Sequence, residues 1–234
     1  MSKNKDMPRF IAFEGSDGCG KTTQLNIFAN LLREKGYNGA VHKGLGGDGK
    51  DFVQNEMRKL LLSPEFPADD METEEKLFAI ADSRNLRSVK KFLEESNSNI
   101  VINDRGVATH IVYALAKNID PNDLYSYHAD MYELYDDLAV QFGGLNVILI
   151  PEDEKLAMER VVARGITVTP RLENLDMQKA VIAGMKRVDR PDTLEGSFMP
   201  ETYSNVTLEV TRTESIPEVT AKIVAALRAA GYGV

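Results

Sequence analysis

Short apolar runs recur along the chain, and in the longer segments between them apolar residues return every three or four positions. Five of these runs predict β-strands, at residues 10–13, 38–42, 100–102, 145–150 and 206–210. Polar residues seldom interrupt the runs, as they would in a strand with one face in water. This continuity indicates strands that are buried on both faces, as in a parallel sheet.

The segments between the runs carry helical spacing. The spacing from Leu25 to Leu32 predicts a helix after the first strand. Further helices are expected at residues 51–62, 72–95, 106–118, 121–141, 152–164 and 216–229. The pair Asp120-Pro121 and a capping box at 215–218 mark the starts of two of them. The alternation predicts an α/β fold, with a five-stranded parallel sheet covered by helices on both faces.

The composition is that of one soluble domain. The chain has 234 residues, 43% of them apolar, and no Pro- or Ser-rich linker divides it, so a single domain over 1–234 is expected. No apolar run approaches the roughly 20 residues that span a bilayer, and the polar beginning lacks a secretory signal. A cytoplasmic protein without a membrane partner is therefore expected. The net charge of −8 disfavours nucleic acid as a partner.

A glycine-rich loop follows the first predicted strand. Residues 15–22 read Gly-Ser-Asp-Gly-Cys-Gly-Lys-Thr and satisfy the pattern G-x-x-x-x-G-K-[ST] between a strand and a helix. Such a loop turns its backbone N–H groups and the positive end of the helix dipole toward phosphate oxygens. We therefore predict a P-loop NTPase fold that binds ATP through Gly15, Ser16, Asp17, Gly18, Cys19, Gly20, Lys21, Thr22 and Thr23.

Individual residues of this loop, and a second glycine loop further along the chain, have different expected roles. Lys21 is expected to reach the outer phosphates, and Thr22 to ligate Mg²⁺ through its hydroxyl. Cys19, the one cysteine of the sequence, is interpreted as a space-filling residue, with a reactive role as the less favoured alternative. A second glycine loop at 44–51 ends in Asp51 instead of a hydroxyl residue, and it is either a substrate loop or a plain connecting turn.

The third predicted strand ends in Asp104-Arg105, at the edge of the sheet where doubly wound folds bind their ligands. Asp104 is expected to serve Mg²⁺, and Arg105 to grip a phosphate. The sequence has no later Asn-Lys-x-Asp motif, which argues against a regulatory GTPase. An acceptor that is already a phosphate needs positioning and charge neutralisation more than a base, so a chain rich in arginines at these positions is typical of a small kinase.

Further arginines occur in two groups. Arg84 lies on the predicted helix 72–95, six residues after Phe78, and the ring of Phe78 is interpreted either as a base-stacking group or as a core aromatic. Arg164 and Arg171 bracket a polar loop. A helical lid over about residues 160–175 is expected to exclude water and to bring positive charge to the transferring phosphoryl group.

These residues resemble the thymidylate kinase family of nucleoside monophosphate kinases. Residues 13–24 resemble its phosphate loop, Asp104-Arg105 with Tyr113 downstream resembles its Asp-Arg motif, and residues 160–173 resemble its lid. The resemblance implies that the acceptor is bound by Asp17, Phe78, Arg84, Arg105 and Tyr113, with Asp17 at the sugar. It also implies a homodimer, and a catalytic set of Lys21, Arg105, Arg164 and Arg171.

The sequence departs from the family on the acceptor side. The family's Arg-Glu-Pro-Gly-Gly segment reads Lys-Gly-Leu-Gly-Gly at 43–47, Gly106 replaces a tyrosine after the Asp-Arg pair, and Ala114 replaces a glutamine. The donor side is intact. We predict a kinase that uses ATP and Mg²⁺ to phosphorylate a deoxynucleoside monophosphate, with dTMP as the best candidate and a different or modified deoxynucleotide left open.

Two other functions stay open at this point. The first is a nucleotide-binding regulatory protein that has kept the loop and lost the acceptor chemistry. The second is a kinase for a nucleoside or for a modified base within DNA, although the negative charge of the chain weighs against DNA.

Overall fold

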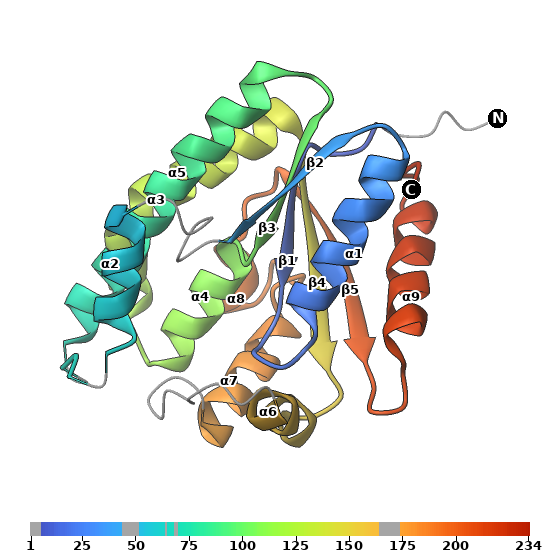
Figure 1. The fold of residues 1–234 in the computed structure, drawn as a ribbon. Coiled ribbons are helices and arrows are strands. Elements are labelled where there is room, and N and C mark those ends of the chain that lie inside the picture. Colours follow the sequence, from blue (N-terminus) through green and yellow to red (C-terminus); the bar gives the residue numbers. More distant parts are fainter. Residues whose placement is uncertain (1–5, 44–51, 64, 68–69, 164–173) are drawn as a thin grey trace.

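One sheet of five parallel strands forms the centre of the molecule (Figure 1). The computed structural model describes residues 6–43, 52–63, 65–67, 70–163 and 174–234. The strand order is β2-β3-β1-β4-β5, so β1 lies in the middle. The strands are β1 (Phe10–Glu14), β2 (Asn38–Lys43), β3 (Asn99–Asp104), β4 (Gly144–Pro151) and β5 (Tyr203–Val210). The predicted α/β fold with a five-stranded parallel sheet is confirmed.

Helices cover both faces of the sheet, with α1 and α9 on one side and α3, α4, α5 and α7 on the other (Figure 1). Helix α6 lies near the carboxyl ends of the strands. The helices of the described residues are α1 (Lys21–Glu34), α2 (Phe52–Leu61), α3 (Met71–Glu95), α4 (Val107–Ala116), α5 (Pro121–Phe142), α6 (Glu154–Ala163), α7 (Leu175–Met185), α8 (Leu194–Ser197) and α9 (Ile216–Ala229).

The two-sided cover explains why the strand sequences are apolar throughout. Successive residues of a strand point to opposite faces, and in β4 Val147 packs in the core cluster of α1 and α9 while Ile148 packs in the cluster of α4 and α7. Every residue of β4 is buried. The edge strand β5 is only partly buried along its length, because it has a neighbouring strand on one side only.

Local signals place the helix starts. Asp120 accepts a hydrogen bond from the backbone N–H of Asn122 at 2.9 Å, with Pro121 in the first turn of α5. Glu218 accepts from the backbone N–H of Ser215 at 2.7 Å at the start of α9. Both predicted starts are confirmed, and each cap satisfies an amide that has no partner inside the helix.

Several boundaries differ from the sequence predictions. Helix α4 ends at Ala116 instead of 118, strand β5 begins at Tyr203 instead of 206, and α7 and α8 were not predicted. The predicted lid over 160–175 lies mostly outside the described residues, since only its two ends belong to the parts of the chain that the structure describes. Within those parts, no helix is long and apolar enough to span a bilayer.

Candidate active site

The phosphate loop joins the end of β1 to the start of α1, at the carboxyl edge of the sheet. Gly15, Gly18 and Gly20 adopt φ values of 139°, 77° and 99°, which glycine reaches far more readily than other residues. A Cβ on Gly15 would lie 2.2 Å from the carbonyl oxygen of Leu149, and a Cβ on Gly18 would lie 2.1 Å from that of Ala157. These glycines let the loop pass against β4 and α6 in a conformation that side chains would block.

Lys21, the first residue of α1, folds back into this loop. Its Nζ donates to the carbonyl oxygens of Gly15 at 2.9 Å and Ser16 at 2.7 Å, and the residue is only 5% exposed. The ammonium group therefore lies in the curve of the loop, next to the first amides of α1. A positive charge beside the positive end of a helix dipole is a suitable binding place for phosphate.

Other residues of the loop and of the first turn of α1 differ in burial. Ser16 and Cys19 are buried, and Cys19 belongs to the core cluster that includes Phe28. Thr22 and Thr23 are exposed on the first turn of α1. The packing of Cys19 beneath the loop favours the space-filling interpretation over a reactive one.

The two residues predicted to hold Mg²⁺ come together at this edge. The hydroxyl of Thr22 donates to Oδ2 of Asp104 at 3.0 Å. The contact forms because β1 and β3 are paired, with Phe13 opposite Asp104, so that α1 begins beside the end of β3. A hydroxyl and a carboxylate supply the oxygen ligands that Mg²⁺ prefers. The donor set therefore fits this ion.

Three of the residues predicted to bind the acceptor form one cluster. Arg105 makes an ion pair with Oδ1 of Asp17, and the hydroxyl of Tyr113 donates to Oδ2 of Asp17 at 2.9 Å. The guanidinium carbon of Arg105 lies 5.2 Å from the ring centre of Tyr113, within the range of a cation–π contact. The cluster joins the phosphate loop, the end of β3 and helix α4 at one place.

The charges of this cluster are well defined. Burial opposes ionisation of Asp17, but the charges of Arg105 and Lys21 and the hydrogen bond from Tyr113 outweigh burial and lower its pKa to about 2. Burial also opposes the charged form of Arg105, but Asp17 raises the pKa of Arg105 above its ordinary value. Burial and the negative charge of Asp17 raise the pKa of Tyr113. At neutral pH the cluster holds an ionised aspartate, a protonated arginine and a neutral tyrosine.

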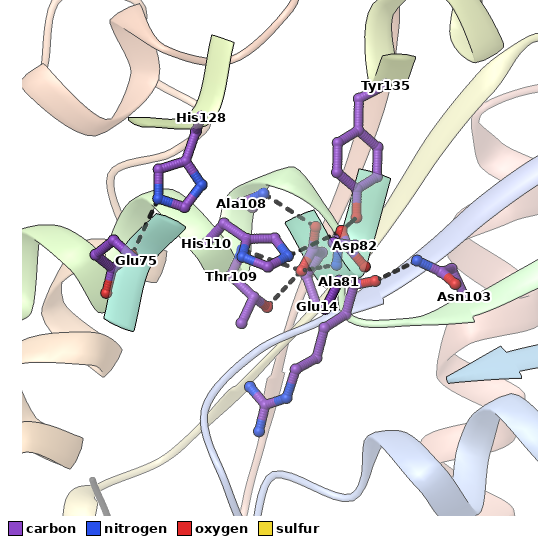
Figure 2. Close-up of polar contacts among 12 residues, drawn as sticks. Glu14, Glu75, Ala81, Asp82, Asn103, Ala108, Thr109, His110, His128 and Tyr135 are labelled. Carbon is purple, nitrogen blue, oxygen red and sulfur yellow. Dashed lines mark hydrogen bonds and ion pairs between the residues drawn. The ribbon is translucent and has the colours of Figure 1, made fainter. Parts of the chain in front are cut away.

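A buried polar network joins side chains of α3, α4 and α5 (Figure 2). Asp82 is fully buried, accepts a hydrogen bond from the hydroxyl of Tyr135 at 2.5 Å, and lies 3.0 Å from Nε2 of His110. Burial opposes protonation of His110, but the carboxylate of Asp82 outweighs it and raises the pKa of His110. The Asp82–His110 pair ties α3 to α4, the helix that carries Tyr113.

A second group of the network surrounds Glu75. Its Oε1 accepts from Nζ of Lys117 at 2.7 Å, and its Oε2 lies 3.0 Å from Nε2 of His128. Burial would raise the pKa of Glu75, but these two partners outweigh burial and lower the pKa to about 2. The Nζ of Lys117 also lies 5.0 Å from the ring centre of Phe78. Phe78 is thus placed beside Lys117, about one turn of α4 beyond Tyr113.

The remaining predicted site residues have different positions. Arg84 is exposed on α3, two residues after Asp82. Arg164, Arg171 and the glycine loop at 44–51 lie outside the described residues. Ala114, at the position of the expected glutamine, is fully buried and packs with Ile119 and Leu124. The roles of these arginines stay predictions, and a glutamine in place of Ala114 would point into the core.

The sequence patterns did not predict the buried network. His110 and His128 are two of the three histidines in the chain, and Glu75 and Asp82 are buried on α3 together with apolar residues such as Val89. An ionisable side chain at a buried helical position needs a polar partner. Ionisable residues at predicted buried positions are therefore the sequence feature that could have indicated the network. The identity of the partner depends on how α3, α4 and α5 pack.

The fold and the site together define the class of protein, a P-loop phosphotransferase: a central strand ends in a phosphate loop, and the pair Thr22–Asp104 and the guanidinium of Arg105 lie beside it. A family model described as thymidylate kinase matches residues 13–195. The chain therefore belongs to the thymidylate kinase family and is an ATP-dependent nucleotide kinase. The resemblance noted from the residues is confirmed.

Individual relatives support this assignment. A probable thymidylate kinase of Methanococcus maripaludis is 31% identical over 205 residues, which cover 88% of this chain and 88% of the relative. A thymidylate kinase of Caldicellulosiruptor saccharolyticus is 29% identical over 185 residues, which cover 78% of this chain and 83% of the relative. The crystal structure of thymidylate kinase from Ehrlichia chaffeensis matches with a TM-score of 0.62 and 21% identity over 94% of this chain and 98% of that chain, and this likeness concerns the fold.

Proposed function

We propose that this kinase transfers the γ-phosphoryl group of ATP to dTMP and forms dTDP. The observation that carries the proposal is the ion pair between Arg105 and Asp17, which puts a guanidinium group for an acceptor phosphate directly beside the phosphate loop. Membership of the thymidylate kinase family supports dTMP as the acceptor. The nucleotides are the proposed partners, with ATP as the donor and Mg²⁺ as the cofactor.

The proposed roles follow from where each side chain lies. Lys21 would neutralise the outer phosphates of ATP, since its ammonium group lies within the loop. Thr22 and Asp104 would hold Mg²⁺, which supplies charge neutralisation at the transferring phosphoryl group. Arg164 and Arg171 are proposed to complete this charge from the lid, on the strength of the resemblance alone.

Arg105 and its neighbours would receive the acceptor. A guanidinium carries five N–H donors, and the pair with Asp17 and the contact with the Gly15 carbonyl at 3.5 Å do not use all of them. The remaining donors can hold a second anion. Asp17 would then be left to accept from the sugar of the acceptor, with Tyr113 beside it and Arg84 as a further phosphate ligand.

In the proposed phosphoryl transfer, the protein acts mainly by positioning the two nucleotides. The acceptor phosphate is anionic at neutral pH, so the cluster needs no general base to generate the nucleophile. Its task is to hold two anions in line and to offset their repulsion, which fixed positive charges do well where water is excluded.

The test is turnover with a panel of monophosphates. ATP consumption and product formation are measured with dTMP, dUMP, dCMP, dAMP and dGMP, and with the corresponding ribonucleotides. We expect dTMP to give the highest kcat/KM, and Arg105→Ala to lower turnover with dTMP by about 10²- to 10³-fold. Turnover with none of the panel, together with ATP hydrolysis that Arg105→Ala leaves unchanged, would contradict the proposal and favour the regulatory alternative.

The expected homodimer and cytoplasmic location stay predictions, as does a single domain over the whole chain. The oligomeric state can be measured by light scattering or sedimentation of the purified chain. A monomer at micromolar concentration would contradict the expected dimer.

A further inference from the structure

Glu14, the last residue of β1, is a fully buried carboxylate directly before the phosphate loop. Its Oε2 accepts from the backbone N–H groups of Gly106 at 2.9 Å and Thr109 at 3.1 Å, and from the hydroxyl of Thr109 at 2.5 Å. Its Oε1 accepts from the backbone N–H of Ala108 at 3.1 Å. Figure 2 shows the carboxylate against the start of α4.

These donors belong to the first turn of α4 and the residue before it. The first amides of a helix have no partner within the helix, and their dipoles point toward an anion placed there. Helices are usually capped by a residue of their own chain segment, and for α4 the residue at this position, Gly106, has no side chain to offer. A carboxylate from the neighbouring strand takes over the task, and it binds the central strand to the start of α4.

Gly106 is the residue that makes room for this arrangement. A Cβ at this position would lie 2.7 Å from Oε1 of Glu14 and 2.8 Å from the Cβ of Ala12. Its φ of −149° is open to any residue, so the position needs space and not a special backbone conformation. In this chain the carboxylate of Glu14 and the Cβ of Ala12 occupy the space where a side chain at position 106 would begin.

Arg105 lies between these contacts, and its main chain is held at three points. Its N–H donates to the carbonyl oxygen of Phe13 at 3.0 Å, and its own carbonyl oxygen accepts from the side-chain amide of Asn103 at 2.7 Å. The following N–H, of Gly106, is the one that Glu14 binds. Arg105 also has a φ of 78°, a left-handed conformation that costs a non-glycine residue energy and persists only where its surroundings enforce it.

We propose that Glu14 is a positioning residue for the acceptor: by binding the start of α4 it fixes Arg105 relative to the phosphate loop and so sets the affinity for the acceptor phosphate. The proposal rests on the proposed role of Arg105. Glu14 acts through Arg105 and touches neither nucleotide. The phosphate loop is held by Lys21 and lies against Leu149 and Ala157. The hydrogen bonds of the Glu14 carboxylate go to the start of α4 and not to this loop.

The first experiment is Glu14→Gln in the full chain. The amide keeps the size of the side chain but offers one acceptor oxygen and turns an NH₂ group toward backbone N–H groups. We expect the Kd for dTMP, measured by calorimetry, to rise about tenfold or more, and the Kd for ATP to stay within about twofold. An equal loss of affinity for both nucleotides would overturn the proposal, because it would indicate general damage to the sheet edge.

A double-mutant cycle tests whether the effect passes through Arg105. We expect Glu14→Gln to change dTMP affinity by less than about twofold when Arg105 is already Ala. The same loss in the Arg105→Ala background as in the wild type would overturn the proposal. These comparisons concern variants against their parents, so a wild type that phosphorylates no monophosphate contradicts the proposed function separately.

Thr109→Val is the substitute test if Glu14→Gln does not fold, because it removes only one hydrogen-bond donor, the Thr109 hydroxyl, from the carboxylate of Glu14. We expect a rise of about threefold to tenfold in the Kd for dTMP and an unchanged Kd for ATP. The matched control is Thr202→Val, which removes a hydroxyl that donates at 2.8 Å to the carboxylate of Asp136, on another part of the molecule. Equal effects of the two valine variants on dTMP binding would overturn the proposal.

Discussion

The proposed donor and acceptor sides of the site are built in different ways. The donor side is formed mainly by one continuous stretch, residues 15–22, of which Asp17 also faces the acceptor side; its shape comes from backbone torsions and from a lysine that bonds to its own loop. On the acceptor side, residues far apart in the sequence meet, as Asp17 meets Tyr113 and Asp82 meets Tyr135. A local motif is enough to form the proposed donor side, whereas the proposed acceptor side depends on how these particular helices pack.

The difference predicts how each side responds to change. Substitutions on the donor side are expected to affect the chemical step and to leave acceptor binding alone. Substitutions on the acceptor side are expected to act through stability or through acceptor affinity, because their contacts hold α3, α4 and α5 together.

The largest expected effect is that of Lys21→Met. The substitution removes the charge that lies inside the loop, and we expect kcat to fall by about 10²- to 10³-fold while the Kd for dTMP changes by less than about twofold. Steady-state kinetics and calorimetry measure the two quantities. Lys35→Met, at the exposed far end of α1, is the control. A loss of dTMP affinity as large as the loss of kcat would remove the distinction between the two sides.

The next effect is on stability. In Glu75→Gln the buried His128 and Lys117 lose a charged acceptor, and we expect the free energy of unfolding at pH 7 to fall by about 1.5–3 kcal/mol. Glu72→Gln, on the exposed outer part of α3, breaks an ion pair with Lys76 and should cost less than about 1 kcal/mol. Denaturant unfolding measures both. Equal losses would mean that the buried network contributes no more than a surface pair.

The stability difference between the wild type and Glu75→Gln should depend on pH. The pKa of Glu75 is lowered from its ordinary 4.5 to about 2 in the folded state, so its contribution to stability is fully present above pH 4.5 and is lost as the pH falls toward 2. The difference in unfolding free energy between the wild type and Glu75→Gln should therefore shrink over this range. A difference that stays constant from pH 5 to pH 2 would contradict the assignment.

A smaller effect is expected for Tyr113→Phe. The variant keeps the ring beside Arg105 but loses the hydrogen bond to Asp17, and we expect the KM for dTMP to rise about fivefold to tenfold with the KM for ATP unchanged. Tyr125→Phe, on an exposed position of α5, is the control. An effect on the KM for ATP instead would show that the tyrosine serves the donor side.

The smallest effect is expected for Cys19→Ala. The sulfur packs in the core beneath the loop, so its removal should lower stability by about 1 kcal/mol and leave turnover within about twofold. Thermal unfolding and steady-state kinetics measure these quantities. A loss of turnover above tenfold would give the cysteine a direct part in the reaction.

The strands and most helices could be predicted from the sequence because their burial produces a regular apolar pattern. Helix α7 was missed since its inner face includes Gln178 and Gly184, which interrupt that pattern. Helix α8 spans only Leu194–Ser197, which is too short for any periodicity to develop. The boundaries of β5 shifted because an edge strand is only partly buried along its length.

The candidate site likewise has parts that could be predicted from the sequence and parts that could not. The phosphate loop and the pair Thr22–Asp104 could be predicted, since the pattern of residues and the end of a buried strand suffice. The contact of Phe78 with Lys117 could not, because it depends on the rotation of α3 against α4. The sequence identifies Glu14 only as part of the phosphate-loop motif. Its capping of the helix that begins at Val107 could not be predicted, because the two segments are far apart in the sequence.

The position of β1 in the middle of the sheet has a consequence for synthesis on the ribosome. Phe10 pairs with Val101 on one side and with Gly144 on the other, so both neighbours of the first strand emerge long after it. Parallel pairing between distant segments has a large loop-closure cost, and such topologies fold slowly. A nascent chain that has not yet released β4 lacks the backbone of Leu149 against which Gly15 rests. We therefore expect the nucleotide site to form only after β4 has been made.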